Sequence, residues 1–97
     1  MKSIIITFNQ AYYEEIVDIM DHLMIRGYTY WDQVRGRGSV NGEPRMGSHS
    51  WPEMNSVILT VVEDEKVDGF LEKLRALDHT REVMGLRAFV SPVEKVI

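Results

Sequence analysis

The sequence predicts an α+β fold in which four strands and two helices follow one another in the order β-α-β-β-α-β. Short runs rich in β-branched residues alternate with two longer stretches whose apolar residues recur at helical spacing. A long segment rich in glycine and proline joins the two halves, and the central strands can pair antiparallel across it. This order is that of the ferredoxin-like split βαβ arrangement, a βαββαβ sandwich with both helices on one face of a four-stranded antiparallel sheet.

The first half of the chain predicts a strand, a helix and a second strand. Residues 3–8 are rich in isoleucine and too few for a helix, and Asn9 can cap the helix that follows. Gly27 stands where a C-cap glycine would end that helix, and the partly aromatic residues 28–34 predict the second strand. Apolar residues at three- and four-residue spacing indicate the helix: Tyr13, Ile16, Val17, Met20, Leu23 and Met24.

The second half of the chain repeats this pattern. Residues 55–62 predict the third strand, and Asp64 can cap a second helix. Residues 86–90 predict the fourth strand, and Pro92 marks its end or an edge position. The second helix has its own apolar stripe: Val67, Phe70, Leu71, Leu74 and Leu77.

The predicted sheet is apolar on both faces. A sheet with helices on one side normally exposes polar residues on the other. In the third strand apolar residues occupy both sides, with Val57, Leu59 and Val61 on one and Ile58 and Val62, with Thr60, on the other. The second face needs a cover that a chain of this length cannot supply, so we expect a homo-oligomer with its sheets facing inward.

The composition is typical of a single soluble globular domain, residues 1–97. The chain is 44% hydrophobic and 27% charged, and the absence of cysteine excludes a disulfide scaffold and a thiolate zinc site. No apolar run approaches the ~18 residues that cross a membrane, so we expect a cytoplasmic protein without membrane insertion. The net charge of −4 argues against nucleic-acid binding.

Residues 36–53 form an unusually long segment between the two central strands. Its four glycines and two prolines disfavour helix and strand. Loops beyond ~12–15 residues are uncommon in compact domains and are usually functional or disordered. Its entry, residues 35–45, has three arginines and one glutamate, a net charge of +2 that favours an anionic ligand or an acidic partner. Arg45, His49 and Trp51 are candidate partner contacts, although Trp51 is slightly better suited to hold the loop end against the domain.

Two stretches of the sequence resemble the PII nitrogen-regulatory signalling proteins. GYTY at 27–30 with VRGRG at 34–38 resembles the G-M-T-x and V-x-G-x-G motifs of that family. FVSPVEKVI at 89–97 resembles its last strand, F-V-x-P-V-E-x-x-I, and is the more specific match. The spacing of strands and helices agrees with the family along nearly the whole chain.

The resemblance implies a regulatory trimer of ferredoxin-like subunits. PII proteins hold an adenine nucleotide in the cleft between subunits, and their long loop, the T-loop, docks on membrane transporters or metabolic enzymes. Residues 36–53 correspond to that loop, whose ordering by a ligand would transmit the signal. The ligand-binding residues implied here are Gly36, Arg37, Gly38 and Arg87, with phosphate or bicarbonate as the anion.

The chain departs from the family pattern at the phosphate-binding loop. Residues 84–87, MGLR, stand where the family has G-D-G-K, so Arg87 alone keeps the terminal cation. Glycines let backbone N–H groups approach phosphate closely, and we expect Met84 and Leu86 to reshape that cradle. The loop is shorter than in the family and lacks the tyrosine that is uridylylated, which argues against control by that modification.

Two other functions are compatible with the same fold. His49 and Met46 are suitable ligands for a soft or divalent metal such as copper or zinc, as expected for a metal-responsive module similar to the divalent-cation-tolerance proteins or linked to heavy-metal efflux. Alternatively, the loop binds only protein. Catalysis is not expected, because the chain has no cysteine nucleophile, no serine in a strand–turn–helix elbow and no carboxylate pair in a suitable context.

Overall fold

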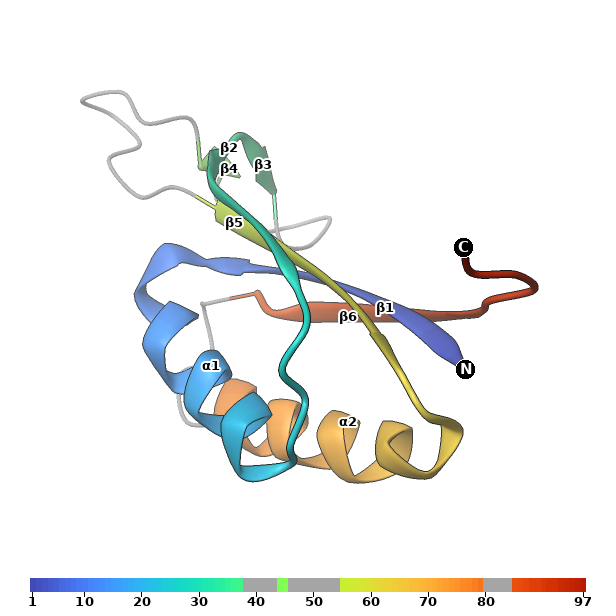
Figure 1. Ribbon diagram of the computed structural model, residues 1–97. Coiled ribbons are helices and arrows are strands. Elements are labelled where there is room, and N and C mark those ends of the chain that lie inside the picture. Colours follow the sequence, from blue (N-terminus) through green and yellow to red (C-terminus); the bar gives the residue numbers. More distant parts are fainter. Residues whose placement is uncertain (38–43, 46–54, 80–84) are drawn as a thin grey trace.

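The computed structural model describes residues 1–37, 44–45, 55–79 and 85–97 of the chain (Figure 1). The four predicted strands are present, and their ends lie within two residues of the predicted ends. In chain order the elements are β1 (Lys2–Asn9), the 3-10 turn η1 (Gln10–Tyr12), α1 (Tyr13–His22), β2 (Thr29–Val34), β3 (Gly36–Arg37), β4 (Pro44–Arg45), β5 (Asn55–Val62), α2 (Asp64–His79) and β6 (Arg87–Pro92).

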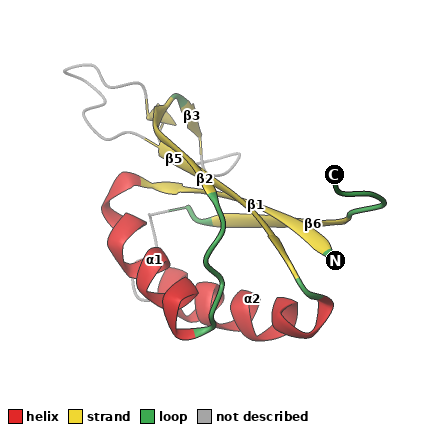
Figure 2. Ribbon diagram, in the orientation of Figure 1, coloured by secondary structure: helices red, strands yellow, loops and turns green. Residues whose placement is uncertain are grey.

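The main sheet has the ferredoxin-like strand order that the sequence predicts. Its four strands lie in the order β2-β5-β1-β6, and every neighbouring pair is antiparallel. Both helices cover one face, as Figure 2 shows, which confirms the predicted two-layer fold. The β1–β5 register is regular over its whole length, whereas β2 shifts its register against β5 between Trp31 and Val34. β6 is an edge strand that ends at Pro92, as predicted.

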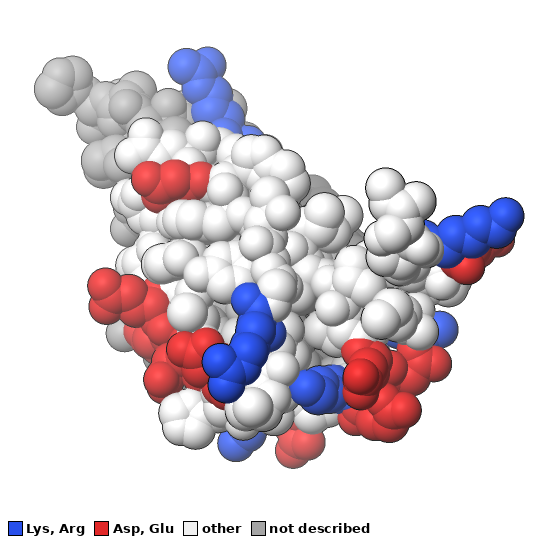
Figure 3. Space-filling view, in the orientation of Figure 1, with Lys and Arg blue, Asp and Glu red and all other residues white. Residues whose placement is uncertain are grey.

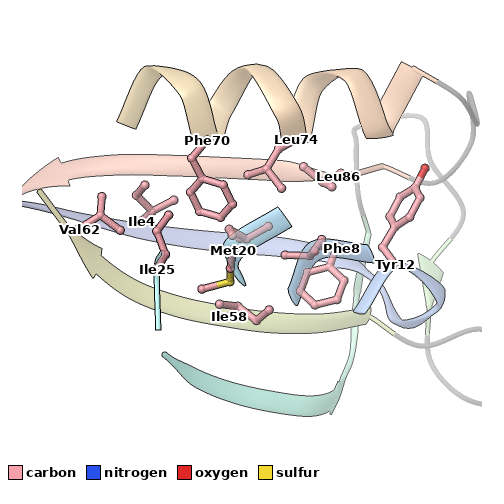
Figure 4. Close-up of a cluster of buried hydrophobic side chains, with 12 residues drawn as sticks. Ile4, Phe8, Tyr12, Met20, Ile25, Ile58, Val62, Phe70, Leu74 and Leu86 are labelled. Carbon is pink, nitrogen blue, oxygen red and sulfur yellow. The ribbon is translucent and has the colours of Figure 1, made fainter. Parts of the chain in front are cut away.

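The core lies between the helices and the sheet (Figure 4). Alternate residues of β1 and β5 point toward the helices because side chains alternate across a strand. The largest fully buried apolar side chains come from β1, β5, the 3-10 turn and both helices: Ile4, Ile6, Phe8, Tyr12, Ile16, Met20, Ile58, Phe70 and Leu74. Burial of one such side chain contributes roughly 1.5–3 kcal/mol, so this layer supplies most of the folding free energy.

Two buried hydroxyls join β5 to the chain beside it. The Ser56 hydroxyl donates a hydrogen bond to the main-chain carbonyl of Asp32, and the Thr60 hydroxyl donates one to the carbonyl of Gly27 at 2.6 Å. Both residues are buried, and a buried hydroxyl without a partner is destabilising. These bonds hold β2 and the segment before it against the sheet.

Three tyrosines fix the edge strand β2 against α1. The rings of Tyr13 and Tyr30 stack with centroids 4.1 Å apart, and the Tyr13 and Tyr28 hydroxyls are 3.0 Å apart. The Tyr28 hydrogen bond is the main cause that raises the pKa of Tyr13 to about 12, and burial is the main cause that raises the pKa of Tyr30. Both phenols therefore stay protonated at neutral pH.

Helix α1 ends at His22, five residues before the predicted C-cap glycine, Gly27. The helix closes with a Schellman motif, in which the Ile25 amide donates to the Met20 carbonyl at 2.8 Å and the Met24 amide to the Asp21 carbonyl at 3.1 Å. Met24, with φ of 59°, occupies the left-handed position that we assigned to Gly27. That assignment was wrong because Ile25 is drawn into the core, so the chain must turn before it reaches Gly27.

Met24→Gly is expected to stabilise the protein by up to about 1 kcal/mol. A non-glycine residue in the left-handed region costs roughly 1–2 kcal/mol, part of which is offset by the greater backbone entropy of glycine in the unfolded chain. Met24 is exposed, so little buried area is lost. The measurement is the midpoint of chemical denaturation, with Gly27→Ala as the control at the position that we had predicted. A midpoint unchanged in Met24→Gly would contradict the assignment of the strain to Met24.

The predicted helix caps are confirmed at one helix and wrong at the other. The Asn9 side chain accepts a hydrogen bond from the Ala11 amide at 2.8 Å and caps the 3-10 turn that leads into α1. Asp64 is the first residue of α2 rather than its cap. Its carboxylate is 2.9 Å from the Met1 ammonium, an ion pair that lowers the Asp64 pKa. The long-range ion pair competes for the side chain that we expected to cap the helix.

The face of the sheet away from the helices is apolar and uncovered in the single chain. The register aligns Phe89 on β6 with Ile5 on β1, and Ile5 with Leu59 on β5. Phe89 is 59% exposed, Trp31 47% and Ile5 42%, and together they make an exposed apolar patch across one face of the sheet. We refer to Ile5, Trp31, Leu59, Val61 and Phe89 as the open face.

Part of the segment that we expected to be irregular forms a second, two-stranded ladder. β3 pairs antiparallel with β4, with Gly36 opposite Arg45 and Arg37 opposite Pro44. The expectation that residues 36–53 avoid strand structure is therefore wrong at these four positions. A ladder of two residue pairs needs few hydrogen bonds. The flexibility of Gly36 and the missing N–H of Pro44 therefore do not prevent its formation.

Candidate ligand-binding site

Two of the predicted ligand-binding residues lie at the same end of the sheet but on opposite edges. β2 ends at Val34, which is opposite Asn55, and Gly36 follows it on the β2 edge. Arg87 begins β6 on the other edge, opposite Thr7 near the end of β1. With three strand spacings between the edges, they are separated by roughly 14 Å. A ligand that contacts both must lie across this end of the sheet or in a cleft that a second subunit completes.

Gly36 is packed closely against the base of the sheet. A Cβ added at Gly36 would lie 3.0 Å from the Nδ2 atom of Asn55, which is tighter than ordinary contact. Asn55 is buried and begins β5. Any side chain at Gly36 would displace this amide, so the glycine lets the base of the long segment approach the sheet.

Arg37 and Arg45 belong to the β3–β4 ladder next to this end of the sheet. The pairing of Gly36 with Arg45 and Arg37 with Pro44 places the two arginines on adjacent rungs of one ladder. The other predicted residues of this segment, namely Gly38, Met46, His49 and Trp51, lie outside the described residues. In Figure 3 both acidic and basic side chains lie over the helices.

Arg87 lies beside a groove between β6 and α2. Its Nη1 atom donates a hydrogen bond to the Leu86 carbonyl at 3.3 Å, so its side chain folds back over the start of β6. The Leu86 amide donates to a carboxylate oxygen of Asp78 at 3.2 Å. Gly85, with φ of 67°, adopts the left-handed conformation just before, which suits a glycine. The Leu86 peptide is thus held at both its N–H and its C=O.

Sequence reasoning missed the α2 side of this groove. Arg75 and Asp78 line it together with Arg87, and its apolar floor includes Leu74 and Leu86. A carboxylate in the last turn of a helix is unfavourable in the helix dipole. That unfavourable placement was the one signal in the sequence that Asp78 has a specific partner.

The described part of the chain shows neither a metal cluster nor a membrane-spanning helix. No group of three or more His, Asp or Glu side chains among residues 1–37, 44–45, 55–79 and 85–97 is placed to hold a metal ion. The two residues predicted as metal ligands, His49 and Met46, lie outside these ranges. No described helix is long and apolar enough to cross a membrane.

Comparison with protein families identifies the class to which this chain belongs. The sequence model of the nitrogen regulatory protein P-II family matches residues 1–97. The match spans the whole chain, and the chain therefore belongs to the PII family of regulatory proteins. This confirms the resemblance seen at residues 27–38 and 89–97. A comparison with curated protein sequences gives no significant match.

Solved structures of PII-like proteins share the fold. CPII from Thiomonas intermedia K12, a nitrogen regulatory PII-like protein bound to ADP, AMP and bicarbonate, is 23% identical with a TM-score of 0.76, over 93% of this chain and 82% of that one. Its apo form has a TM-score of 0.72 at 22% identity, over 93% and 85%. A PII-like signalling protein from Thermus thermophilus is 21% identical with a TM-score of 0.64, over 93% and 83%.

Proposed function

We propose that this protein is a trimeric PII-like signalling regulator, not an enzyme, that binds an adenine nucleotide at the end of the sheet defined by Gly36 and Arg87. The bound ligand sets the conformation of residues 36–53, and this loop docks on a cytoplasmic partner, either a membrane transporter or a metabolic enzyme. The observation that carries the proposal is the placement of Gly36, Arg37 and Arg87 at one end of a PII-family sheet. Arginine suits phosphate because its planar fork donates two parallel hydrogen bonds.

The structural relatives support an adenine nucleotide as the ligand. CPII is described with ADP and AMP, and in two of its structures with bicarbonate. Bicarbonate is the smaller anion that Arg35 and Arg37 are suited to bind in the present chain. The acidic body of the protein, with a net charge of −4, makes this cationic end the favourable place for an anion.

The open face supports the trimer. Three exposed apolar sheets that face one another would remove Phe89, Ile5 and Trp31 from water, and the hydrophobic effect favours such burial by roughly 25 cal/mol per Å². The placement of Gly36 and Arg87 on opposite edges of the sheet is also compatible with a trimer. In a trimer, a ligand at one edge of a subunit can also contact a neighbouring subunit.

Metal sensing has no comparable support. The family match and the nucleotide-bound relatives favour the nucleotide, and His49 with Met46 would supply only two ligands from the undescribed part of the loop. We therefore propose nucleotide binding as the function, and a metal titration of the wild type is a useful control. An unchanged melting temperature with copper and zinc is the result expected.

The proposal is tested by titration calorimetry with ADP. We expect wild-type binding in the sub-millimolar range or tighter and roughly tenfold weaker binding in Arg87→Ala, because a hydrogen bond between charged groups contributes about 1.5–3 kcal/mol. Arg26→Ala is the matched control, since Arg26 is exposed and lies near Val61 and Val62 at the opposite end of β5. The absence of ADP and AMP binding to the wild type would reject nucleotide sensing.

A further inference from the structure

The groove between α2 and β6 has the dimensions and charges of an anion site. Its volume is about 240 Å³, with Leu74 and Leu86 buried in its floor. Arg75 and Arg87 are exposed at its sides, and Asp78 is half-buried between α2 and the start of β6. Among the described residues, two guanidinium groups and one carboxylate line the groove and give a net charge of +1, opposite in sign to the net charge of −4 of the whole chain.

Neither arginine is neutralised in the described part of the chain. The ion pairs formed there are Met1–Asp64 and Asp18–His22. Arg87 donates to a main-chain carbonyl only, and one oxygen of Asp78 is already engaged by the Leu86 amide. Asp78 and Arg75 lie three residues apart on one side of α2, yet they form no ion pair. Guanidinium groups without carboxylate partners, placed beside one groove, can both bind an incoming anion.

We propose that the groove between α2 and β6 binds a diphosphate group, with Arg75 and Arg87 as the two cations, and that it forms the phosphate end of the proposed nucleotide site. The inference rests on the proposed function for the nucleoside part of the ligand. Arg75 is a binding residue that belongs to none of the motifs that the chain shares with the PII family. It supplies a second cation from α2, next to the position where the sequence MGLR at 84–87 replaces the glycine-rich pattern of the family.

A diphosphate is favoured over a monophosphate because there are two cations. One phosphate group can occupy the fork of Arg87 alone, and the second arginine then has no further phosphate to bind. With two phosphate groups both forks are used. Arg75 therefore determines the preference for a nucleoside diphosphate over a monophosphate.

The test is calorimetric titration with inorganic pyrophosphate and then with ADP and AMP. We expect pyrophosphate and ADP to bind roughly tenfold more weakly to Arg75→Ala than to the wild type, and AMP to be affected less. Arg75→Lys keeps the charge without the fork and is expected to be intermediate. Lys73→Ala is the matched control: it removes the same charge from an exposed position of the same helix, about 200° away around its axis.

A second variant changes the affinity in the opposite direction. Asp78→Asn removes a negative charge and keeps a side-chain oxygen that can accept from the Leu86 amide, so pyrophosphate binding is expected to strengthen several-fold. Circular dichroism of each variant is the check that α2 remains folded. Weaker pyrophosphate binding to Asp78→Asn would contradict the arrangement of charges.

The outcomes separate this inference from the proposed function. Equal affinity of Arg75→Ala and wild type for both pyrophosphate and ADP overturns the inference and leaves nucleotide sensing intact. Pyrophosphate binding that depends on Arg75, with no binding of ADP or AMP, supports the groove as a diphosphate site and rejects the nucleotide. Absence of pyrophosphate binding to the wild type also overturns the inference.

Discussion

Ile5→Glu is expected to convert the proposed trimer into monomers. Ile5 lies at the centre of the open face, between Leu59 on β5 and Phe89 on β6, and its side chain points away from the helices. In the trimer a glutamate here would be buried without a cation, which costs several kcal/mol for each subunit. In the monomer the same side chain is exposed to water, so folding is retained. Size-exclusion chromatography with light scattering measures the change in mass.

A matched control places the same charge on the other side of the molecule. Ala76 is exposed on α2, in the layer of helices on the far side of the sheet from the open face. Ala76→Glu is expected to leave the oligomer intact, since glutamate is well tolerated in a helix. A wild-type protein that is monomeric at micromolar concentration, or an oligomer unaffected by Ile5→Glu, would exclude the open face as the subunit interface.

Phe70→Ala is expected to lower the free energy of unfolding by about 3–5 kcal/mol. Phe70 is fully buried on the side of α2 that packs against the sheet, and it belongs to the main core cluster. Truncation removes its buried area and leaves a cavity that the neighbouring strands cannot fill. Domains of this size are typically stable by about 5–15 kcal/mol, so the variant is marginal. Chemical denaturation at a fixed protein concentration is the measurement, because assembly adds to apparent stability.

A substitution at the neighbouring residue, Gly69, is a control that is expected to raise the free energy of unfolding instead of lowering it. A Cβ added at Gly69 meets nothing within 4 Å, and Gly69 lies inside α2. Gly69→Ala is therefore expected to stabilise the protein by about 1 kcal/mol through helix propensity. If Phe70→Ala lowers the unfolding free energy by less than about 1 kcal/mol, the assignment of Phe70 to the core is wrong.

Local patterns were sufficient to predict the four strands of the main sheet and the two helices, but not the β3–β4 ladder. The strands and helices followed from hydrophobic periodicity because both faces of β5 and one face of each helix are apolar. The end of α1 did not follow, since the requirement to bury Ile25 moved the left-handed residue from Gly27 to Met24. The capping role assigned to Asp64 failed because its partner, the Met1 ammonium, is more than sixty positions away in the sequence.

The candidate site was only partly accessible from the sequence. Gly36 and Arg87 were singled out by their resemblance to family motifs, and the structure places them at one end of the sheet on opposite edges. Arg75 and Asp78 were not recognised from the sequence, because an arginine and an aspartate on an amphipathic helix have the pattern of an ordinary solvated face. Their contribution depends on the packing of α2 against the start of β6, which is a tertiary relation.

The irregular register of β2 separates the pairing of the central strands from the start of the long segment. β1 and β5 pair without interruption, whereas β2 loses its register with β5 between Trp31 and Val34, just before the long segment begins. An irregularity at this place disrupts the ladder locally and bends the strand. The central β1–β5 ladder is therefore complete without a continuous β2, and the long segment leaves the sheet from a strand that is irregularly paired near its end.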